Sequence, residues 1–390
     1  MAIEFETMFN IPTLALKLNF LHPQNEKNRK WIIKLLIIHG FYTLFFLNII
    51  YYNIYPNLKN REFIRTCHNV LFVVIYLTTS FKCWVVISKG KTILKLINMM
   101  KEDFQTSDTL IEEKKVVEDF AKKGRRISMR WLRFSTYAML TFPLKHLCLK
   151  IYYFIIGDFQ ILPPYDITYP SLIEDVKFEF IPYVLIYFVF LYYLAYTLTM
   201  FVGFGSLGPV FIIHACGQLE LAKRDISSLF IDSDEEAIAR RMKIFTQRMQ
   251  RVYIFAENMN ETFRLAYELT LKAIIVILPL TGYAANKSFR EGGVSVELLN
   301  ITFGGIISSG VPCYFSDLLK QKSEEVRQAI YACGWESQNS LSQRSALLIA
   351  LTRTLRPVAI NTIFSTLCLE TLADVLKQAY TIFNLMNATM

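Results

Sequence analysis

Long apolar stretches alternate with charged segments along the whole chain. A helix needs about 20 apolar residues to cross a hydrocarbon core about 30 Å thick. Seven stretches meet this requirement, at 31–54, 63–87, 129–156, 180–204, 265–285, 294–314 and 358–387. The pattern predicts an all-α polytopic membrane protein with seven transmembrane helices.

The composition agrees with this interpretation. Hydrophobic residues make up 53% of the chain and charged residues only 19%, whereas an ordinary soluble domain carries about 25% charged residues. Glu4, Glu6 and Glu26 precede the first span, where a cleaved signal peptide would have a basic segment and a short apolar core. We expect the first spanning helix to act as its own insertion signal.

The distribution of lysine and arginine predicts the orientation of the chain. Basic residues crowd the segments 89–126 and 223–251, whereas the segment 158–177 is mainly acidic. Cytoplasmic loops are the basic ones, so the N-terminus is predicted to be cytoplasmic and, after seven spans, the C-terminus extracellular. The net charge of +9 comes from these loops and not from one basic face, so no nucleic-acid partner is expected.

This orientation is the reverse of that of G-protein-coupled receptors. The sequence also lacks a D-R-Y triplet after the third span and an N-P-x-x-Y motif in the last. A metabotropic seven-helix receptor remains as an alternative, which an extracellular N-terminus would support.

Helical patterning continues beyond several spans. Apolar residues recur at helical spacing in 215–229, 240–262 and 316–332, which predicts that the fourth, fifth and sixth helices extend into the cytoplasm and pack together there. The single unit of 390 residues then divides as follows: spans one to four in 31–204, extensions in 205–262, spans five and six in 265–314, a cytoplasmic anchor in 315–356 and the last span in 357–388.

Two shorter helical features follow from local signals. The segment 89–126 predicts an amphipathic helix outside the membrane. Ser340 or Ser342 is expected to cap a helix that runs to Leu355, with Pro357 in the first turn of the last span.

Motifs that suggest chemistry have simpler explanations. Gly203, Gly205 and Gly208 match G-x-G-x-x-G, but a dinucleotide site needs a preceding strand. Close helix packing explains them better, because the motif ends a predicted membrane helix. His214 and Cys216 lack further ligands at metal spacing. We therefore expect no enzyme activity, no metal and no cofactor, and the scattered cysteines predict no disulfide framework.

The last span carries a polar stripe. At about 100° per residue, one helix face holds Glu370, Asp374, Lys377, Thr381, Asn384, Leu385 and Ala388. Ionisable groups at membrane depth face protein or water and mark ion or substrate paths. Two interpretations remain open from the stripe alone: a pore wall in an oligomer, or a bundle helix whose polar face contacts the chain's own cytoplasmic extensions.

The C-terminal third resembles insect odorant receptors. The segments 369–372 and 377–386 (L-E-T-L and K-Q-A-Y-T-I-F-N-L-M) are similar to the C-terminal signature of that family, and 312–315 and 331–335 add to the likeness. Ile382 stands where the family often has tyrosine.

The resemblance implies an odorant-gated, non-selective cation channel in the plasma membrane of sensory neurons. It implies a heterotetramer with odorant co-receptor subunits, in which the last helix lines the pore. Leu385 would match the hydrophobic gate, with Thr381 and Ala388 on the same wall. Only 232–239 separates the two helical extensions, where the co-receptor has a long insertion, so the chain resembles a tuning subunit.

A homomeric gustatory-type channel is the second interpretation, although the T-Y-x-x-x-x-x-Q-F ending of that family is absent. The odorant-receptor interpretation also places membrane lipid, permeating cations and a small volatile molecule among the partners.

The odorant site is expected, from the family, in the outer halves of spans two to five. An apolar volatile needs an aromatic cavity with few polar groups. The candidates at suitable depth are Phe72, Tyr76, Met139, Phe142, Tyr187, Leu191 and Ile277. Lys145 either meets a polar odorant group, forms an ion pair or extends toward the membrane surface.

Overall fold

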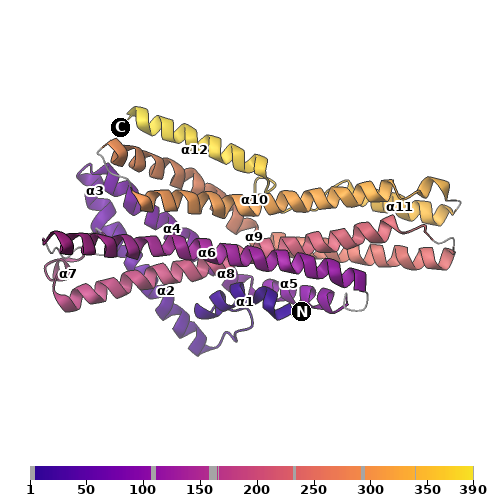
Figure 1. Cartoon of the computed structure of the whole chain (residues 1–390), viewed down its shortest axis with the longest axis horizontal. Helices are drawn as coiled ribbons and strands as arrows, with labels where there is room; N and C mark the ends of the chain where they lie inside the picture. The colour runs from indigo at the N-terminus through magenta and orange to yellow at the C-terminus, as the bar shows by residue number, and fades with distance from the viewer. Residues whose placement is uncertain are drawn as a thin grey trace.

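A computed structural model describes residues 5–106, 111–157, 165, 167–231, 234–290, 295–338 and 340–389. Within these residues the chain is almost entirely helical (Figure 1). The helices are α1 (Phe5–Leu18), α2 (Arg29–Ile49), α3 (Tyr55–Lys59), α4 (Phe63–Ser88), α5 (Gly90–Thr106), α6 (Ile111–Ile156), α7 (Ser171–Glu174), α8 (Phe180–Ser227), α9 (Glu235–Arg290), α10 (Val296–Tyr331), α11 (Leu341–Thr354) and α12 (Leu369–Thr389).

The described residues contain six helices with the length and hydropathy to cross a membrane. These are Arg29–Lys59, Phe63–Ser88, Glu112–Ile156, Phe180–Ser227, Glu235–Arg290 and Val296–Tyr331, and they correspond to the first six predicted spans. α12 has 21 residues, which span about 31 Å, but it carries Glu370, Asp374 and Lys377. The prediction of an all-helical polytopic membrane fold is confirmed.

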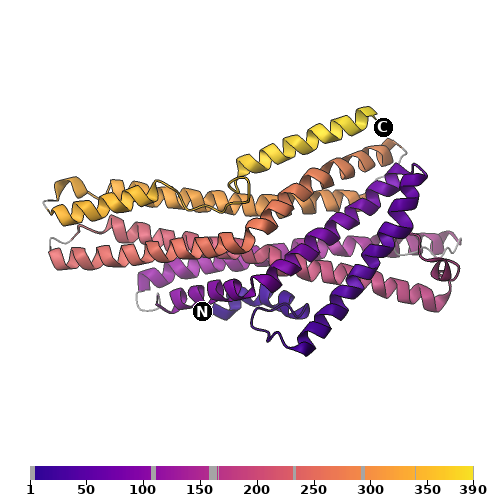
Figure 2. The same cartoon turned by 180° about the vertical axis from the view of Figure 1, so that it is seen from behind.

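The long helices run roughly along one axis of the molecule (Figure 1). The short helices α3 and α7 and the C-terminus lie at one end, which we call the α7 end. The other end, which we call the α11 end, is formed by α11 and the neighbouring parts of α9 and α10. Seen from behind, α2 and α4 meet at the α7 end, where α3 joins them (Figure 2).

The predicted start of the last span is wrong. Residues 358–368 are not helical, and α12 begins only at Leu369, so Pro357 does not open a helix. The physical reason is that tertiary contacts replace helical hydrogen bonds, because the backbone N–H of Val358 donates to Ser323 Oγ at 3.0 Å.

Other predicted helix boundaries also differ from those in the structure. The segment 89–126 is not one helix, because α5 ends at Thr106 and α6 then continues unbroken into the third span. The third helix therefore extends beyond the membrane, as do α8, α9 and α10, whose extensions were predicted. Ser340 precedes α11 as expected, but its side chain makes no capping hydrogen bond in the described structure.

Helix α8 lies at the centre of the bundle and packs against α1, α6, α9 and α10. At three of its glycines, those of the G-x-G-x-x-G motif, the lack of a side chain lets a residue of a neighbouring helix approach closely. A Cβ on Gly203 would lie 3.0 Å from Leu16 of α1, a Cβ on Gly205 would lie 2.7 Å from the Trp131 ring of α6, and a Cβ on Gly208 would lie 1.9 Å from the Tyr267 hydroxyl of α9. The interpretation of G-x-G-x-x-G as a helix-packing motif is confirmed.

Ion pairs join the helix extensions toward the α11 end. Lys322 of α10 lies 2.9 Å from both Glu220 of α8 and Glu325 of its own helix. Burial alone would lower the pKa of the Lys322 amine, but its bonds to the two carboxylates raise it overall. These bonds fix the register of α8 against α10.

We predict that Gly208→Ala destabilises the fold. The added methyl group would overlap the hydroxyl of the buried Tyr267 side chain, and such overpacking costs about 1–3 kcal/mol. Thermal unfolding of the purified protein should show a lower Tm. Gly40→Ala is the matched control, because a Cβ there has no neighbour within 4 Å. Equal melting temperatures of the two variants would contradict the packing role of Gly208.

Candidate functional site

Five helices, α4, α6, α8, α9 and α10, enclose a cavity of about 120 Å³, which we call the bundle cavity. Its lining is mostly aliphatic and aromatic. The lining residues are Phe72, Ile75, Thr78, Thr79, Lys82, Phe134, Ser135, Ala138, Met139, Phe142, Tyr193, Leu194, Thr197, Phe201, Thr270, Ala273, Ile274, Ile277, Asn300, Ile301, Gly304, Gly305 and Ser308. An apolar cavity of this size is large enough for one small apolar molecule.

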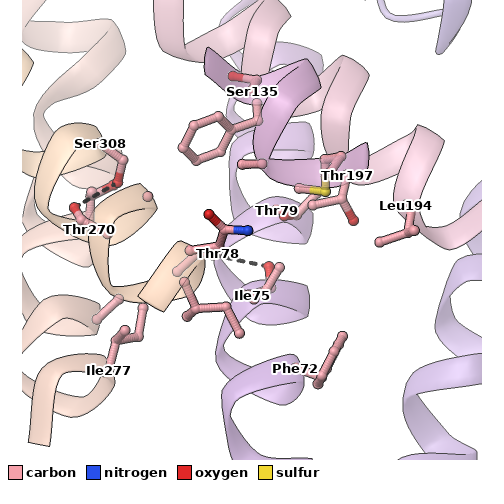
Figure 3. A pocket seen from close by; sticks show the side chains of 18 of the residues that line it. Phe72, Ile75, Thr78, Thr79, Ser135, Leu194, Thr197, Thr270, Ile277 and Ser308 are labelled. Carbon is pink, nitrogen blue, oxygen red and sulfur yellow. Dashed lines mark hydrogen bonds between the residues drawn. The ribbon is translucent and has the colours of Figure 1, made fainter. Parts of the chain in front are cut away.

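The structure brings four of the seven predicted odorant residues into this lining. Phe72 comes from α4, Met139 and Phe142 come from α6, and Ile277 comes from α9. The rings of Phe72 and Phe142 meet edge to face, with centroids 6.2 Å apart. Figure 3 shows Phe72 and Ile277 toward one end of the cavity and Ser135 toward the other.

The other three predicted residues lie outside the lining. Tyr76 turns toward α2, where its ring stacks on Phe46 with centroids 3.9 Å apart and its hydroxyl lies 2.9 Å from Thr43 Oγ1. Tyr187 packs beside His146, and Leu191 is half-buried elsewhere on α8. All three are at suitable depth, but their helices turn other faces toward the cavity.

Sequence reasoning missed the polar part of the lining and the whole contribution of α10. Asn300, Gly304, Gly305 and Ser308 of α10 line the cavity. The signal available was the pair of adjacent glycines and the asparagine within an otherwise apolar span. The Asn300 side-chain amide donates to Thr141 Oγ1 of α6, which links the two helices beside the cavity.

A second cavity of about 540 Å³, which we call the vestibule, lies on the α7 side and shares Phe72, Phe142 and Ile301 with the bundle cavity. It is more polar than the bundle cavity. Its polar lining residues are Arg65, His68, Asn69, Lys145, His146, Tyr165, Ser295 and Glu297. Lys145 pairs with Glu297, so of its three predicted roles the structure shows the ion pair.

Helix α12 packs on α9 and α10 through one apolar face. Leu372, Val375 and Ala379 on that face are buried. The predicted stripe lies on the opposite face, and all its members are exposed: Glu370, Asp374, Lys377, Thr381, Asn384, Leu385 and Ala388. Leu385 is 63% exposed. The alternative in which the polar face contacts the chain's own extensions does not fit, because the apolar face makes the packing contacts.

Hydrogen bonds attach the segment before α12 to α9 and α10. Asn260 of α9 accepts from the backbone N–H of Asn361 at 2.8 Å and donates to the carbonyl of Ala359 at 3.1 Å. Asp317 of α10 accepts from the backbone N–H of Leu369 at 2.8 Å, which satisfies a free donor in the first turn of α12. Two helices that line the bundle cavity therefore also hold the base of α12.

No group of three or more histidine, cysteine, aspartate or glutamate side chains that suits a metal ion occurs among the described residues. His214 instead lies 2.9 Å from the Asp103 carboxylate, and Cys216 is a buried free cysteine.

The fold is similar to that of solved insect receptors. It matches the olfactory receptor OR5 from Machilis hrabei with a TM-score of 0.71 over 96% of both chains. It matches the same receptor in complex with eugenol with a TM-score of 0.76 over 97% of both chains. Each match has 11% sequence identity and therefore shows the fold alone.

The chain is also similar in sequence to two curated odorant receptors. Odorant receptor 13a of Drosophila melanogaster is 24% identical over 244 residues, which cover 58% of this chain and 57% of that protein. Odorant receptor 10a of the same species is 24% identical over 241 residues, which cover 59% of this chain and 58% of that protein. The chain thus spans less than three fifths of the length of these relatives.

A family-wide comparison covers more of the chain. The 7tm odorant receptor family matches residues 62–380, from the start of α4 into α12. The members of this family are receptors, in agreement with the expectation that the chain is not an enzyme. Because the match extends over most of the sequence, the chain belongs to the 7tm odorant receptor family.

Proposed function

We propose that this chain is the odorant-binding tuning subunit of a heteromeric, odorant-gated, non-selective cation channel. The observation that carries the proposal is α12, whose polar stripe is exposed along its whole length while its apolar face packs on the bundle. A polar, partly charged face is too costly to expose to lipid. Water enclosed by several copies of α12 removes that cost.

In this proposal the stripe forms the ion path. Copies of α12 surround a central axis, with Asp374, Lys377 and Thr381 along the wall. Leu385 and Ala388 narrow the path near the C-terminal end, where a ring of leucines closes a pore by excluding water. One helix cannot enclose a path, so the function requires an oligomer.

The bundle cavity is the proposed odorant site. Its mainly apolar lining and few polar groups suit a small volatile molecule. The related fold of OR5 has been solved in complex with eugenol, which supports a small organic ligand for this chain. Phe72, Met139, Phe142 and Ile277 are the proposed contacts among the residues predicted from sequence.

Gating follows from the shared role of α9 and α10. Both helices line the bundle cavity, and both hold α12 through Asn260 and Asp317. The Phe383 ring of α12 also lies against Gly282 of α9, where an added Cβ would be 3.0 Å from it. A ligand that binds better when α9 and α10 are in their open-state positions shifts the population toward an open pore.

The subunit assembles with odorant co-receptor subunits in a heterotetramer of the sensory-neuron plasma membrane, in our proposal. At the α11 end, Leu341, Leu348, Ile349 and Leu355 are exposed apolar side chains on or beside α11. Exposed apolar clusters mark interaction sites, and this one fits an anchor between subunits. The short connection between α8 and α9 favours the tuning subunit, and the basic loops favour a cytoplasmic N-terminus.

Whole-cell current from the chain expressed alone and with an insect odorant co-receptor tests this proposal. We expect odorant-evoked cation current only after co-expression. Current from the chain alone would favour a homomeric gustatory-type channel. Silence in both, with surface expression confirmed, would contradict the channel, and an N-terminal epitope accessible on intact cells would favour a metabotropic receptor.

We predict that Leu385→Ala raises the resting leak current several-fold, because a smaller side chain leaves the constriction wide enough to stay wet. Current without odorant, normalised to surface expression, is the measurement. Leu369→Ala makes the same truncation at an exposed position at the other end of α12 and should leave the leak unchanged. A wild-type leak in Leu385→Ala would refute the gate assignment.

We predict that Ala138→Phe abolishes the odorant response, because the added ring would fill most of the bundle cavity. Ala195→Phe adds the same ring at an exposed position of α8 and should keep the response. Odorant dose–response curves of the co-expressed channels make the comparison. A normal response from Ala138→Phe would move the odorant site elsewhere.

A further inference from the structure

Lys82 is the one charged residue in the lining of the bundle cavity. It lies within the spanning helix α4, and only 9% of it is exposed. The Lys82 ammonium lies 5.1 Å from the centroid of the Phe201 ring. Among the described residues no carboxylate pairs with it. An aromatic face compensates a desolvated cation only in part. The Lys82 ammonium therefore lacks a carboxylate, the partner that would stabilise it most.

Ser135 supplies a second unpaired polar group in the same lining. It is 2% exposed, and within the described structure its hydroxyl has no hydrogen-bond partner. A hydroxyl buried without a partner is unfavourable, because it has lost its hydrogen bonds to water. Two different helices thus each present an unsatisfied donor to one apolar cavity.

The two groups lie toward the same end of the cavity. Phe72 and Phe142 meet near the vestibule. Lys82 follows Phe72 along α4, whereas Ser135 precedes Phe142 along α6. Because α4 and α6 are antiparallel, both polar groups lie on the α11 side of the two rings. Figure 3 shows Ser135 at the end opposite Phe72 and Ile277. Phe201 also lies on this side, since its ring faces Lys82 and its carbonyl accepts from Trp131, about one turn of α6 from Ser135.

We propose that the bundle cavity selects small apolar molecules that end in a carboxylate, which accepts hydrogen bonds from Lys82 and Ser135. A carboxylate has two oxygens that only accept, so it satisfies both donors at once. The apolar tail then lies toward Phe72, Phe142 and Ile277. This inference rests on the proposed function, because it names the ligand class of the same cavity.

Other ligand ends match these donors less well. An alcohol or aldehyde leaves the ammonium without a counter-charge, and a methyl end leaves both donors unpaired. Hydrogen bonds to a charged group contribute about 1.5–3 kcal/mol, which corresponds to roughly tenfold or more in affinity. The preference for a carboxylate should therefore be measurable in a dose–response experiment.

The test uses the full chain co-expressed with an odorant co-receptor. Straight-chain molecules of equal length that end in a carboxylate, an aldehyde, an alcohol or a methyl group are applied, and the EC50 of each is measured. We expect the carboxylate to act at a concentration at least about tenfold lower than the methyl-ended analogue. Responses without this preference would overturn the inference alone. Silence toward every volatile tested would overturn the proposed function as well.

Variants then assign the preference to its residues. Lys82→Met keeps the length of the side chain but removes the charge, and should weaken the carboxylate response about tenfold while sparing the methyl-ended analogue. Lys82→Arg should retain the preference. Ser135→Ala should weaken the carboxylate response a few-fold. If Lys82→Met fails to reach the cell surface, Ser135→Ala alone tests whether the carboxylate preference arises at this end of the cavity.

Lys150→Met is the matched control, because the Lys150 ammonium also lies over an aromatic ring, 4.4 Å from the Tyr183 centroid, but does not line the bundle cavity. Its carboxylate preference should equal that of the wild type. A full preference in both Lys82→Met and Ser135→Ala would contradict the assignment.

Discussion

The close approach of three helices to the glycines of α8 is the contact on which the rest of the structure depends. Leu16 of α1, Trp131 of α6 and Tyr267 of α9 each occupy space that a side chain on α8 would fill. Few polar contacts are available within a membrane, and van der Waals packing of small residues is a main source of helix association there. With α8 fixed in this way, α6 and α9 are held beside it, and all three helices line the bundle cavity.

Helix α12, unlike α8, is packed within the chain on one face only. Its apolar face is satisfied within the chain by Leu372, Val375 and Ala379, but its polar face is not. In the proposed function, the exposed face of this helix is covered when other subunits surround it. The geometry of α12 thus connects the fold of one chain to the proposed assembly.

The sequence predicts those features that are local. Apolar runs of sufficient length identify the spans, because crossing a bilayer is a matter of helix length and hydropathy. The sequence likewise predicts the stripe from Glu370 to Ala388, because all its members belong to one helix with a known rotation per residue. The sequence also predicts that Gly203, Gly205 and Gly208 serve helix packing, because they end a membrane helix and a dinucleotide site needs a preceding strand.

Other features depend on tertiary contacts and could not be predicted. The helix expected from Val358 is absent because Ser323 and Asn260, distant in sequence, bond the backbone there. Tyr76 and Phe72 are both aromatic on α4, but only Phe72 lines the cavity. Apolar residues occur on every side of α4, so its pattern does not indicate which face meets the cavity and which meets α2.

The rings of Phe72 and Phe142 lie between the vestibule and the bundle cavity and belong to the lining of both. In the proposed function, a molecule that enters from the α7 side reaches the bundle cavity through the vestibule and past Phe72 and Phe142, which line both. A barrier made by these two rings slows entry and exit by the same factor, so it lengthens the lifetime of the bound state without changing the affinity for the inner lining. A receptor built in this way can evolve faster recovery after a stimulus without changing the compounds that it recognises.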